Sequence, residues 1–347
     1  MNKLNYLRAA LVLLSVAMIS ACSSSNDANT PTSEVGIRFS DAPVEDLDEV
    51  MITVDKLIFN RAGEDIVVDT FTSEELSLNE ADTFQLNLLD YQGMESSLVL
   101  DSVTLPVGDY QNLRIVIQEG TGTYVQEKDD TAHKTLKVPS GQLKLGGFTV
   151  SETSTQTFVI EFGLRQAMTY NPGPDRYILK PRGVRIVRME AASSISGTVD
   201  ISTASCLATE GLSHVAYLYA GHNLDTSLLG DVFVREADIE ASPGNEAGVD
   251  YDADVADNII TPAVATSIDP VTGDYIFSYL KDGDYTVAIS CNATEDNAIL
   301  YDGISIPNPA GLIVELSLAK ASNRVCDFVE GFEVESCSEK MIAEAIK

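Results

Sequence analysis

The chain has 347 residues, 44% of them hydrophobic, which is enough for two or three domains with buried cores. It carries 53 acidic and 22 basic residues, a formal net charge of −31. Contacts to phosphates need a basic surface, so this composition excludes nucleic acid as an expected partner, and an anionic membrane surface would repel the chain.

The first 21 residues predict a lipoprotein signal peptide. Lys3 and Arg8 precede an apolar stretch over 9–19 that is too short to span a membrane comfortably. Small residues then lead into Cys22, and this junction resembles a bacterial lipobox. The resemblance implies cleavage before Cys22 and acylation of that cysteine, for example with palmitate, while an ordinary secreted chain with a chance cysteine is the alternative.

The residues after the cleavage point predict where the protein is held. Ser23 stands where lipoproteins of the inner membrane often have Asp, so the outer membrane is the expected location, on either its periplasmic face or the cell surface. Residues 22–33 are polar and lack apolar periodicity, as in a flexible tether. The bilayer, reached through acylated Cys22, is one expected partner. Loss of two positive charges with the leader changes the net charge from −31 to −33.

The rest of the chain predicts an all-β fold. Val35, Ile37 and Phe39 alternate with less apolar neighbours, and a second alternation begins at Val50. It changes phase near Asp55, which predicts a β-bulge. Further strands are expected at 113–117, 158–162 and 177–189, where Pro181 needs an edge or a bulge. Only two short helices are expected, over 73–81 and 339–346.

Residues 34–190 resemble a known bacterial lipoprotein domain. The resemblance rests on Phe39-Ser-Asp-Ala-Pro43, Val50-Met-Ile-Thr-Val-Asp-Lys56, Leu88-Leu-Asp90, Leu105-Pro-Val-Gly-Asp-Tyr110, Val138-Pro-Ser140, Lys144-Leu145, Phe148 and Ile178-Leu-Lys-Pro181. These stretches are similar to the domain of unknown function 4382. That family has no established activity. The resemblance therefore implies a β-sandwich fold for these residues and assigns no catalytic or binding role to any of them.

Residues 194–320 predict a second sandwich. Ile195-Ser-Gly-Thr-Val199, Gly273-Asp-Tyr-Ile-Phe277 and Leu280-Lys-Asp-Gly-Asp-Tyr-Thr-Val287 resemble the carboxypeptidase regulatory-like, transthyretin-like family, interrupted by an acidic insertion at 237–262. The resemblances together imply two Ig-like or transthyretin-like β-sandwiches in tandem. The last segment, 321–347, matches neither family and is expected to be a disulfide-tied tail.

One short pattern occurs in both predicted sandwiches. Leu105–Tyr110 and Leu280–Tyr285 both read Leu-x-x-Gly-Asp-Tyr. Each would deliver a tyrosine to the start of an apolar strand through a glycine turn. Related topologies of the two sandwiches would explain the repeated pattern. Chance is the alternative explanation, because Gly-Asp is a common turn pair.

The cysteines agree with export. Apart from Cys22 the chain has four, at positions 206, 291, 326 and 337, with no Cys-x-x-Cys pair and only three widely spaced histidines. This spacing disfavours zinc and predicts two disulfides in an oxidising compartment. Four cysteines allow three pairings, of which we expect Cys206–Cys291 and Cys326–Cys337.

An acidic cluster is the one candidate metal site. Asp250, Asp252, Asp254 and Asp257 space their carboxylates as in a calcium loop. Val255 and Thr261 stand where such a loop has glycine and its bidentate glutamate. A solvated acidic loop is therefore the favoured interpretation, no cofactor is expected, and calcium is the alternative.

No catalytic motif stands out. Asp41, followed by Ala-Pro43, favours turn capping over ligand binding. We therefore expect a non-enzymatic outer-membrane lipoprotein that serves as a structural, adhesive or ligand-presenting module for an unidentified protein or extracellular polymer. A calcium-stabilised ligand- or carbohydrate-binding lipoprotein is the alternative, and an enzyme of unrecognised type is the third.

Overall fold

The alternating apolar residues of the N-terminal half form strands. In this computed structural model, which describes residues 30–42, 44, 46–153, 155–202, 206, 213–234, 255–294, 296–297, 299–328 and 337–340, Val35, Ile37 and Phe39 are fully buried. The strands of this half are β1 (Thr32–Asp41), β2 (Leu47–Arg61), β3 (Glu64–Val68), β4 (Phe71–Ser73), β5 (Leu78–Ala81), β6 (Phe84–Asn87), β7 (Ser97–Pro106), β8 (Gly108–Tyr110), β9 (Asn112–Ile117), β10 (Tyr124–Glu127), β11 (His133–Lys137), β12 (Gln142–Lys144), β13 (Phe148–Val150), β14 (Thr155–Phe162), β15 (Met168–Asn171), β16 (Arg176–Leu179) and β17 (Val184–Arg188).

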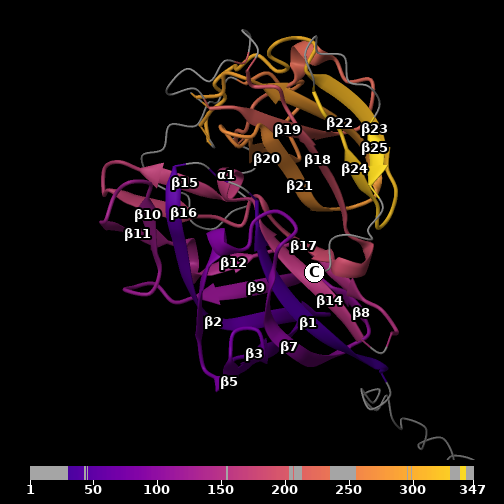
Figure 1. Ribbon diagram of the computed structural model, residues 1–347. Helices are drawn as coiled ribbons and strands as arrows, with labels where there is room; N and C mark the ends of the chain where they lie inside the picture. The colour runs from indigo at the N-terminus through magenta and orange to yellow at the C-terminus, as the bar shows by residue number, and fades with distance from the viewer. Residues whose placement is uncertain are drawn as a thin grey trace, which may run out of the picture. The chain divides into compact units, whose positions relative to one another are not determined.

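These strands enclose one hydrophobic core, which we call the first sandwich. One sheet has the order β17-β14-β1-β7, and the larger one has the order β12-β9-β2-β10-β11-β16-β15, with β3 and β6 also paired to β2. Two short pairs, β13-β8 and β4-β5, complete it. The strands appear in indigo to magenta in Figure 1.

The long strand β2 confirms the predicted phase change. Its buried apolar residues are Val50, Ile52 and Val54 before the change and Leu57 and Phe59 after it. The register with β9 shifts between Val54 and Lys56, so the extra residue of a bulge returns apolar side chains to the core.

The remaining strands form a second sandwich of two four-stranded sheets. They are β18 (Ser193–Thr198), β19 (Val215–Ala220), β20 (Val264–Ser267), β21 (Asp274–Leu280), β22 (Gly283–Ser290), β23 (Ile313–Leu318), β24 (Asn323–Val325) and β25 (Ser338–Lys340). The sheet orders are β21-β18-β24-β25 and β20-β19-β22-β23. Both sandwiches belong to one compact unit, Thr32–Lys347.

The segment after residue 320 contributes to the second sandwich. β24 pairs in parallel with β18, and β25 pairs with β24. Phe328 is 1% exposed and packs in the same core. Pairing with β18 and burial of Phe328 thus tie this segment to the sheet in addition to any disulfide.

The sheet with β19 at its centre is covered on both faces. Ala216 and Leu218 face the core between the two sheets, whereas Val215, Tyr217 and Tyr219 lie in a separate apolar cluster on the other face. Loop residues such as Leu229, Val232 and Ile306 cover that second cluster. β19 is therefore buried on both faces, as its nearly continuous apolar sequence indicates.

Helix is rare in the described residues. There is a one-turn α1 (Leu164–Ala167), and there are four 3-10 turns, Leu88–Asp90, Pro139–Gly141, Met189–Ala191 and Thr226–Leu228. No helix in the described part of the chain is both long and apolar enough to cross a membrane.

The predicted helix over 73–81 is wrong. The Ser73 hydroxyl donates to the carbonyl oxygen of Leu98 and accepts from the N–H of Leu76, which fixes a turn between β4 and β5. Ser77 and Glu80 have positive φ angles, a conformation outside a right-handed helix. At the other predicted helix, Glu339 lies in β25, and residues 341–346 lie outside the described residues.

Candidate functional site

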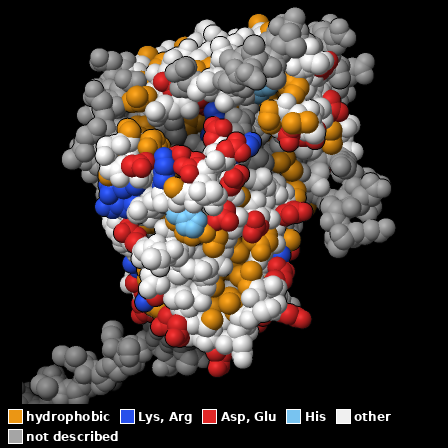
Figure 2. Space-filling model, turned by 60° about the vertical axis from the view of Figure 1, so that its left-hand side comes forward, with side chains coloured by type: hydrophobic (Ala, Val, Ile, Leu, Met, Phe, Trp, Pro, Cys, Tyr) orange, Lys and Arg blue, Asp and Glu red, His pale blue; other side chains and the backbone are white. Residues whose placement is uncertain are grey.

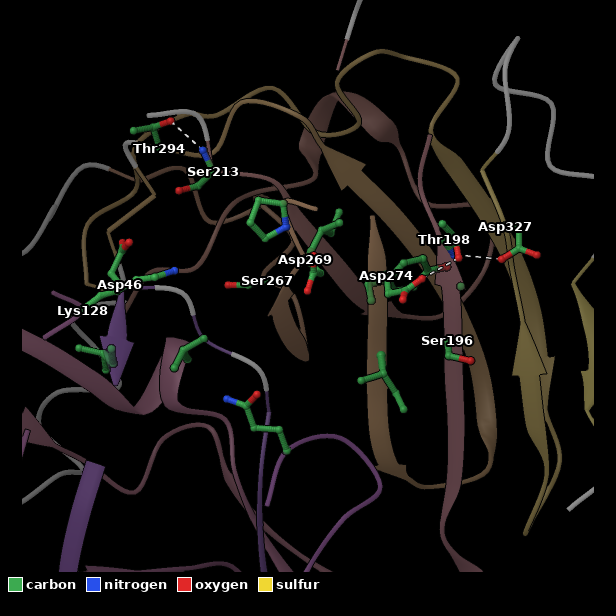
Figure 3. A pocket seen from close by; sticks show the side chains of 18 of the residues that line it. Asp46, Lys128, Ser196, Thr198, Ser213, Ser267, Asp269, Asp274, Thr294 and Asp327 are labelled. Atoms are coloured by element: carbon green, nitrogen blue, oxygen red, sulfur yellow. Dashed lines mark hydrogen bonds between the residues drawn. The ribbon is translucent and has the colours of Figure 1, made fainter. Parts of the chain in front are cut away.

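A polar cleft of about 1000 Å³ lies between the two sandwiches and is the main candidate site. Figure 3 shows Asp46 and Lys128 of the first sandwich on one side, and Thr198, Asp274 and Asp327 of the second on the other. The Ser267 segment, at the end of β20, lies between them.

The wall on the second sandwich is the outer face of β18 and its neighbours. In the register of β18 and β21, Thr198 lies opposite Asp274. The Thr198 hydroxyl donates to Oδ1 of Asp274 over 2.9 Å, and its N–H donates to Oδ1 of Asp327 over 2.9 Å. The two carboxylates therefore flank one threonine and are held in place by it.

A third carboxylate on this side is fixed by a turn. Oδ1 of Asp269 accepts the N–H groups of Val271 and Thr272. The backbone hydrogen bonds of Thr272 and Val271 lower the pKa of Asp269, with a smaller contribution from Lys128 across the cleft. Asp269 is therefore ionised at neutral pH.

The facing wall is also acidic. Asp46 and Asp48 are both exposed, and the carbonyl oxygen of Asp46 accepts the N–H of Lys128. Among the described lining residues the carboxylates are Asp46, Asp48, Asp269, Asp274 and Asp327, and the single cation is Lys128. The cleft thus carries a net charge of about −4, from five carboxylates and one ammonium group.

Ser267 is the buried polar group of the cleft. It is 5% exposed, and its hydroxyl has no hydrogen-bond partner among the described atoms. Its side chain points into the space between the two walls (Figure 3). A buried hydroxyl without a partner is costly, so this group is suited to a bond with a molecule in the cleft.

The walls of the cleft are held by a buried polar contact between the sandwiches. Glu161 of β14 is 1% exposed, and one of its oxygens pairs with Arg185. Its other oxygen accepts the Ser278 hydroxyl of the second sandwich over 2.6 Å, and Arg185 donates to the Ser278 carbonyl oxygen over 3.0 Å. One ion pair therefore binds both sandwiches.

A second buried polar contact also joins the first sandwich to the second. Arg165 of α1 pairs with Asp296 over 3.1 Å, and the same Asp296 oxygen accepts the Tyr217 hydroxyl over 2.7 Å. The Tyr279 hydroxyl of the second sandwich donates to the carbonyl oxygen of Met94 in the first. These buried polar bonds favour a single orientation of the two walls of the cleft relative to each other.

Asp41 lies in this buried region and not in an exposed turn. It is the last residue of β1, is fully buried, and bonds through its backbone to Tyr91 and Gly93. Burial, and after it repulsion by Glu161, raise the pKa of Asp41 well above its usual range, although nearby N–H groups and the Gln92 amide partly oppose this. Neither carboxylate oxygen of Asp41 has a hydrogen-bond partner among the described atoms, so the expected turn-capping role is wrong.

A group of tyrosines, which the sequence did not reveal, lies on β15, the edge strand of the larger sheet, and on its neighbour β16. Tyr170 and Tyr177 face each other with ring centroids 5.1 Å apart, and Lys134 lies 4.5 Å above the Tyr170 ring. The Tyr170 hydroxyl donates to Asp175 and that of Tyr177 to Glu127. Both hydroxyls and one ring face are thus occupied by neighbours, which points to a structural role for this group.

The two predicted disulfides are present. Cys206 is joined to Cys291 and Cys326 to Cys337, with Cα–Cα distances of 5.1 and 4.3 Å. Both disulfides therefore crosslink segments of the second sandwich.

The other predicted site residues are mostly outside the described part of the chain. Cys22, Asp250, Asp252 and Asp254 lie there, and only Asp257 of the acidic cluster is described. Within the described residues no group of three or more His, Cys, Asp or Glu side chains is placed to hold a metal ion.

Acidic side chains are spread over the surface outside the cleft as well. Figure 2 shows them on one face of the molecule, with Lys and Arg gathered in fewer places. The cleft is therefore distinguished by its walls and by Ser267, and not by acidity alone.

Residues 32–181 match the family model described as "Domain of unknown function (DUF4382)". This part of the chain, just under half of its length, is a domain of that family. No curated protein matches the chain.

Solved structures align only distantly. The TIE protein of Bacillus anthracis is 11% identical with a TM-score of 0.17, and the alignment covers 86% of this chain but 33% of that protein. The minor pilin of Streptococcus agalactiae is 11% identical with a TM-score of 0.18, covering 85% and 94%. A candidate cell adhesion protein from Bacteroides uniformis is 5% identical with a TM-score of 0.22, covering 91% and 98%. Such low scores carry no argument about function.

Proposed function

We propose that the chain is a non-enzymatic lipoprotein of the outer membrane that presents two β-sandwiches as one adhesive or ligand-binding module. The lipobox-like sequence at Cys22 and the polar tether over 22–33 support the anchor. The cleft between the sandwiches is the surface through which the module contacts a protein or polymer in the cell envelope.

One observation carries this proposal: the cleft has walls from both sandwiches, and buried contacts join these walls. Glu161, 1% exposed, bonds to Arg185 on its own side and to Ser278 on the other. A binding surface made from two domains needs such fixed walls, since ordering them on binding would reduce the affinity.

The finer fold assignment is part of the proposal. Two facing four-stranded sheets with the Leu-x-x-Gly-Asp-Tyr turn support a transthyretin-like second sandwich. The first strand, β18, lies inside its sheet between β21 and β24, whereas the first strand of an Ig-like sandwich lies at an edge, so the strand order favours the transthyretin-like alternative.

Site-specific photo-crosslinking on intact cells tests the proposed function. A photoreactive residue replaces Asp48 in the cleft or, as a control, Val67, which is 48% exposed and does not line the cleft. We expect crosslinked envelope products from position 48 and not from position 67. The same products from both positions, or none from position 48, would contradict a binding role for the cleft.

A second arm tests the anchor. Wild-type protein should incorporate labelled palmitate and sediment with outer membranes, because acyl chains on Cys22 hold it there. Cys22→Ala should lose both the label and the membrane association. Label that persists in Cys22→Ala would end the lipoprotein assignment.

A further inference from the structure

We propose that the cleft binds a short basic peptide segment whose lysine or arginine side chains bond to the carboxylates of both walls. This inference rests on the proposed binding role of the cleft and adds the chemical class of its ligand.

Charge complementarity is the first argument. Asp46 and Asp48 lie on one wall, and Asp274 and Asp327 on the other. Exposed carboxylates on both sides of a cleft repel each other less when a cation lies between them. The charge of −31 on the whole chain also steers cations towards the surface.

Ser267 is the second and independent argument. Its hydroxyl is buried, lacks a partner among the described atoms and points into the cleft. An ammonium or guanidinium group carries several N–H donors and no acceptor, so it can donate to Oγ of Ser267 and to a carboxylate at the same time. A ligand with such donors would satisfy the one buried group that the protein leaves unpaired here.

Apolar lining residues favour a peptide over a small free cation. Val44, Leu47, Ile268, Ile276 and Val325 line the cleft beside the carboxylates. The methylene stem of lysine or arginine packs on such surface while its charged end reaches an acidic group. A volume of about 1000 Å³ is also at the upper end of ligand pockets and larger than one small amine needs.

Calorimetry on the full mature chain tests the inference. The probes are a blocked Lys-Gly-Lys peptide, a blocked Gln-Gly-Gln peptide of similar size, and spermidine. We expect the lysine peptide to bind, with an affinity that falls as salt rises, and the glutamine peptide not to bind. Spermidine binding as tightly as the lysine peptide would overturn the peptide class in favour of a small polyamine.

Matched variants locate the binding site. Asp46→Asn with Asp48→Asn should weaken binding about tenfold, because two charged contacts are lost. Asp69→Asn with Asp82→Asn makes the same charge change at exposed positions outside the cleft and should change binding less than about twofold. Equal effects of both pairs, or no binding of the lysine peptide, would refute the inference.

The variant Ser267→Ala tests the contribution of the Ser267 hydroxyl to peptide binding separately from that of the carboxylates. The side chain is buried and its hydroxyl is unpaired, so we expect the variant to be at least as stable as the wild type and to bind the peptide several-fold more weakly. Unchanged binding would remove Ser267 from the proposed site. Crosslinking from position 48 without peptide binding would defeat this inference alone, whereas peptide binding without crosslinking would defeat the proposed function.

Discussion

The Tyr110 hydroxyl donates a hydrogen bond to the carbonyl oxygen of Pro106, four residues earlier, over 2.9 Å. Tyr285 makes the same bond to Lys281 over 3.0 Å in the second sandwich. Gly108 and Gly283 precede these tyrosines by two residues, and both have positive φ angles, which glycine adopts without strain. The shared sequence Leu-x-x-Gly-Asp-Tyr thus encodes one local structure used twice, a tyrosine corner of the kind found in β-sandwiches.

Removing these bonds should destabilise the two sandwiches unequally. Tyr110 is 2% exposed, so Tyr110→Phe leaves the Pro106 carbonyl group with one bond fewer in a buried setting and should cost about 1 kcal/mol of unfolding free energy. Tyr285 lies nearer to solvent, and Tyr285→Phe should cost less. Urea denaturation of both variants measures this, and a larger loss in Tyr285→Phe would contradict it.

The contact between the sandwiches should depend on its ion pair. Arg185→Met leaves the buried Glu161 carboxylate without its cation and should lower the unfolding free energy by about 3 kcal/mol. Arg185→Met with Glu161→Gln should lose much less, since no unpaired charge remains. Arg114→Met, which breaks a more exposed pair with Asp65, is the control and should have the smallest effect.

If the single variant Arg185→Met and the double variant are equally stable in urea denaturation, the Glu161 carboxylate does not need its cation, and the pair does not hold the sandwiches together.

Asp231 should make stability depend on pH. It is fully buried, one of its oxygens accepts the N–H groups of Asp302 and Ile304, and burial raises its pKa to about 7. The unfolded chain binds this proton only below about pH 4, so the contribution of Asp231 is complete below that pH and is lost as the pH rises towards 7. The carboxylates of Asp296 and Asp302 add to the shift.

Asp231→Asn resembles the protonated carboxyl and should not titrate. We expect the variant to gain stability relative to the wild type between about pH 4 and pH 7, with no further change above that range. Melting temperatures of both proteins across this range measure the difference. A difference that is constant with pH would show that Asp231 titrates normally.

The acidic residues from position 191 onwards should respond to salt and not specifically to calcium. This half has 26 acidic and 6 basic residues, a net charge of −20, so monovalent salt should raise the melting temperature by screening. At a fixed salt concentration of about 0.15 M, millimolar calcium should add no more than magnesium. A calcium-specific increase that disappears in Asp252→Ala would instead support a calcium site.

Much of the fold follows from apolar alternation. Residues such as Val35, Ile37 and Phe39, and the phase change near Asp55, gave strands and a bulge because the period of two is set by the backbone itself. The stretch at 73–81 does not form the predicted helix because its turn depends on the Ser73 bond to Leu98, a contact between segments distant in sequence.

The candidate site was not predictable from the sequence in the same way. Its walls come from segments on both sandwiches, and no local pattern brings Asp48 near Asp274. One signal for the contact between the sandwiches was present: Val159 and Glu161 both point away from the first core on β14, and an apolar residue at an outward position indicates a covered face.

Both sandwiches close by the same kind of strand pairing. β1 pairs in parallel with β14, so that Ile37 lies opposite Phe158, and β18 pairs in parallel with β24. The first strand of each sandwich, β1 or β18, therefore pairs with a strand that is synthesised much later. Neither sandwich can therefore complete the sheet that holds its first strand until that later strand has left the ribosome, so each fold depends on pairing between segments far apart in the sequence, which slows folding.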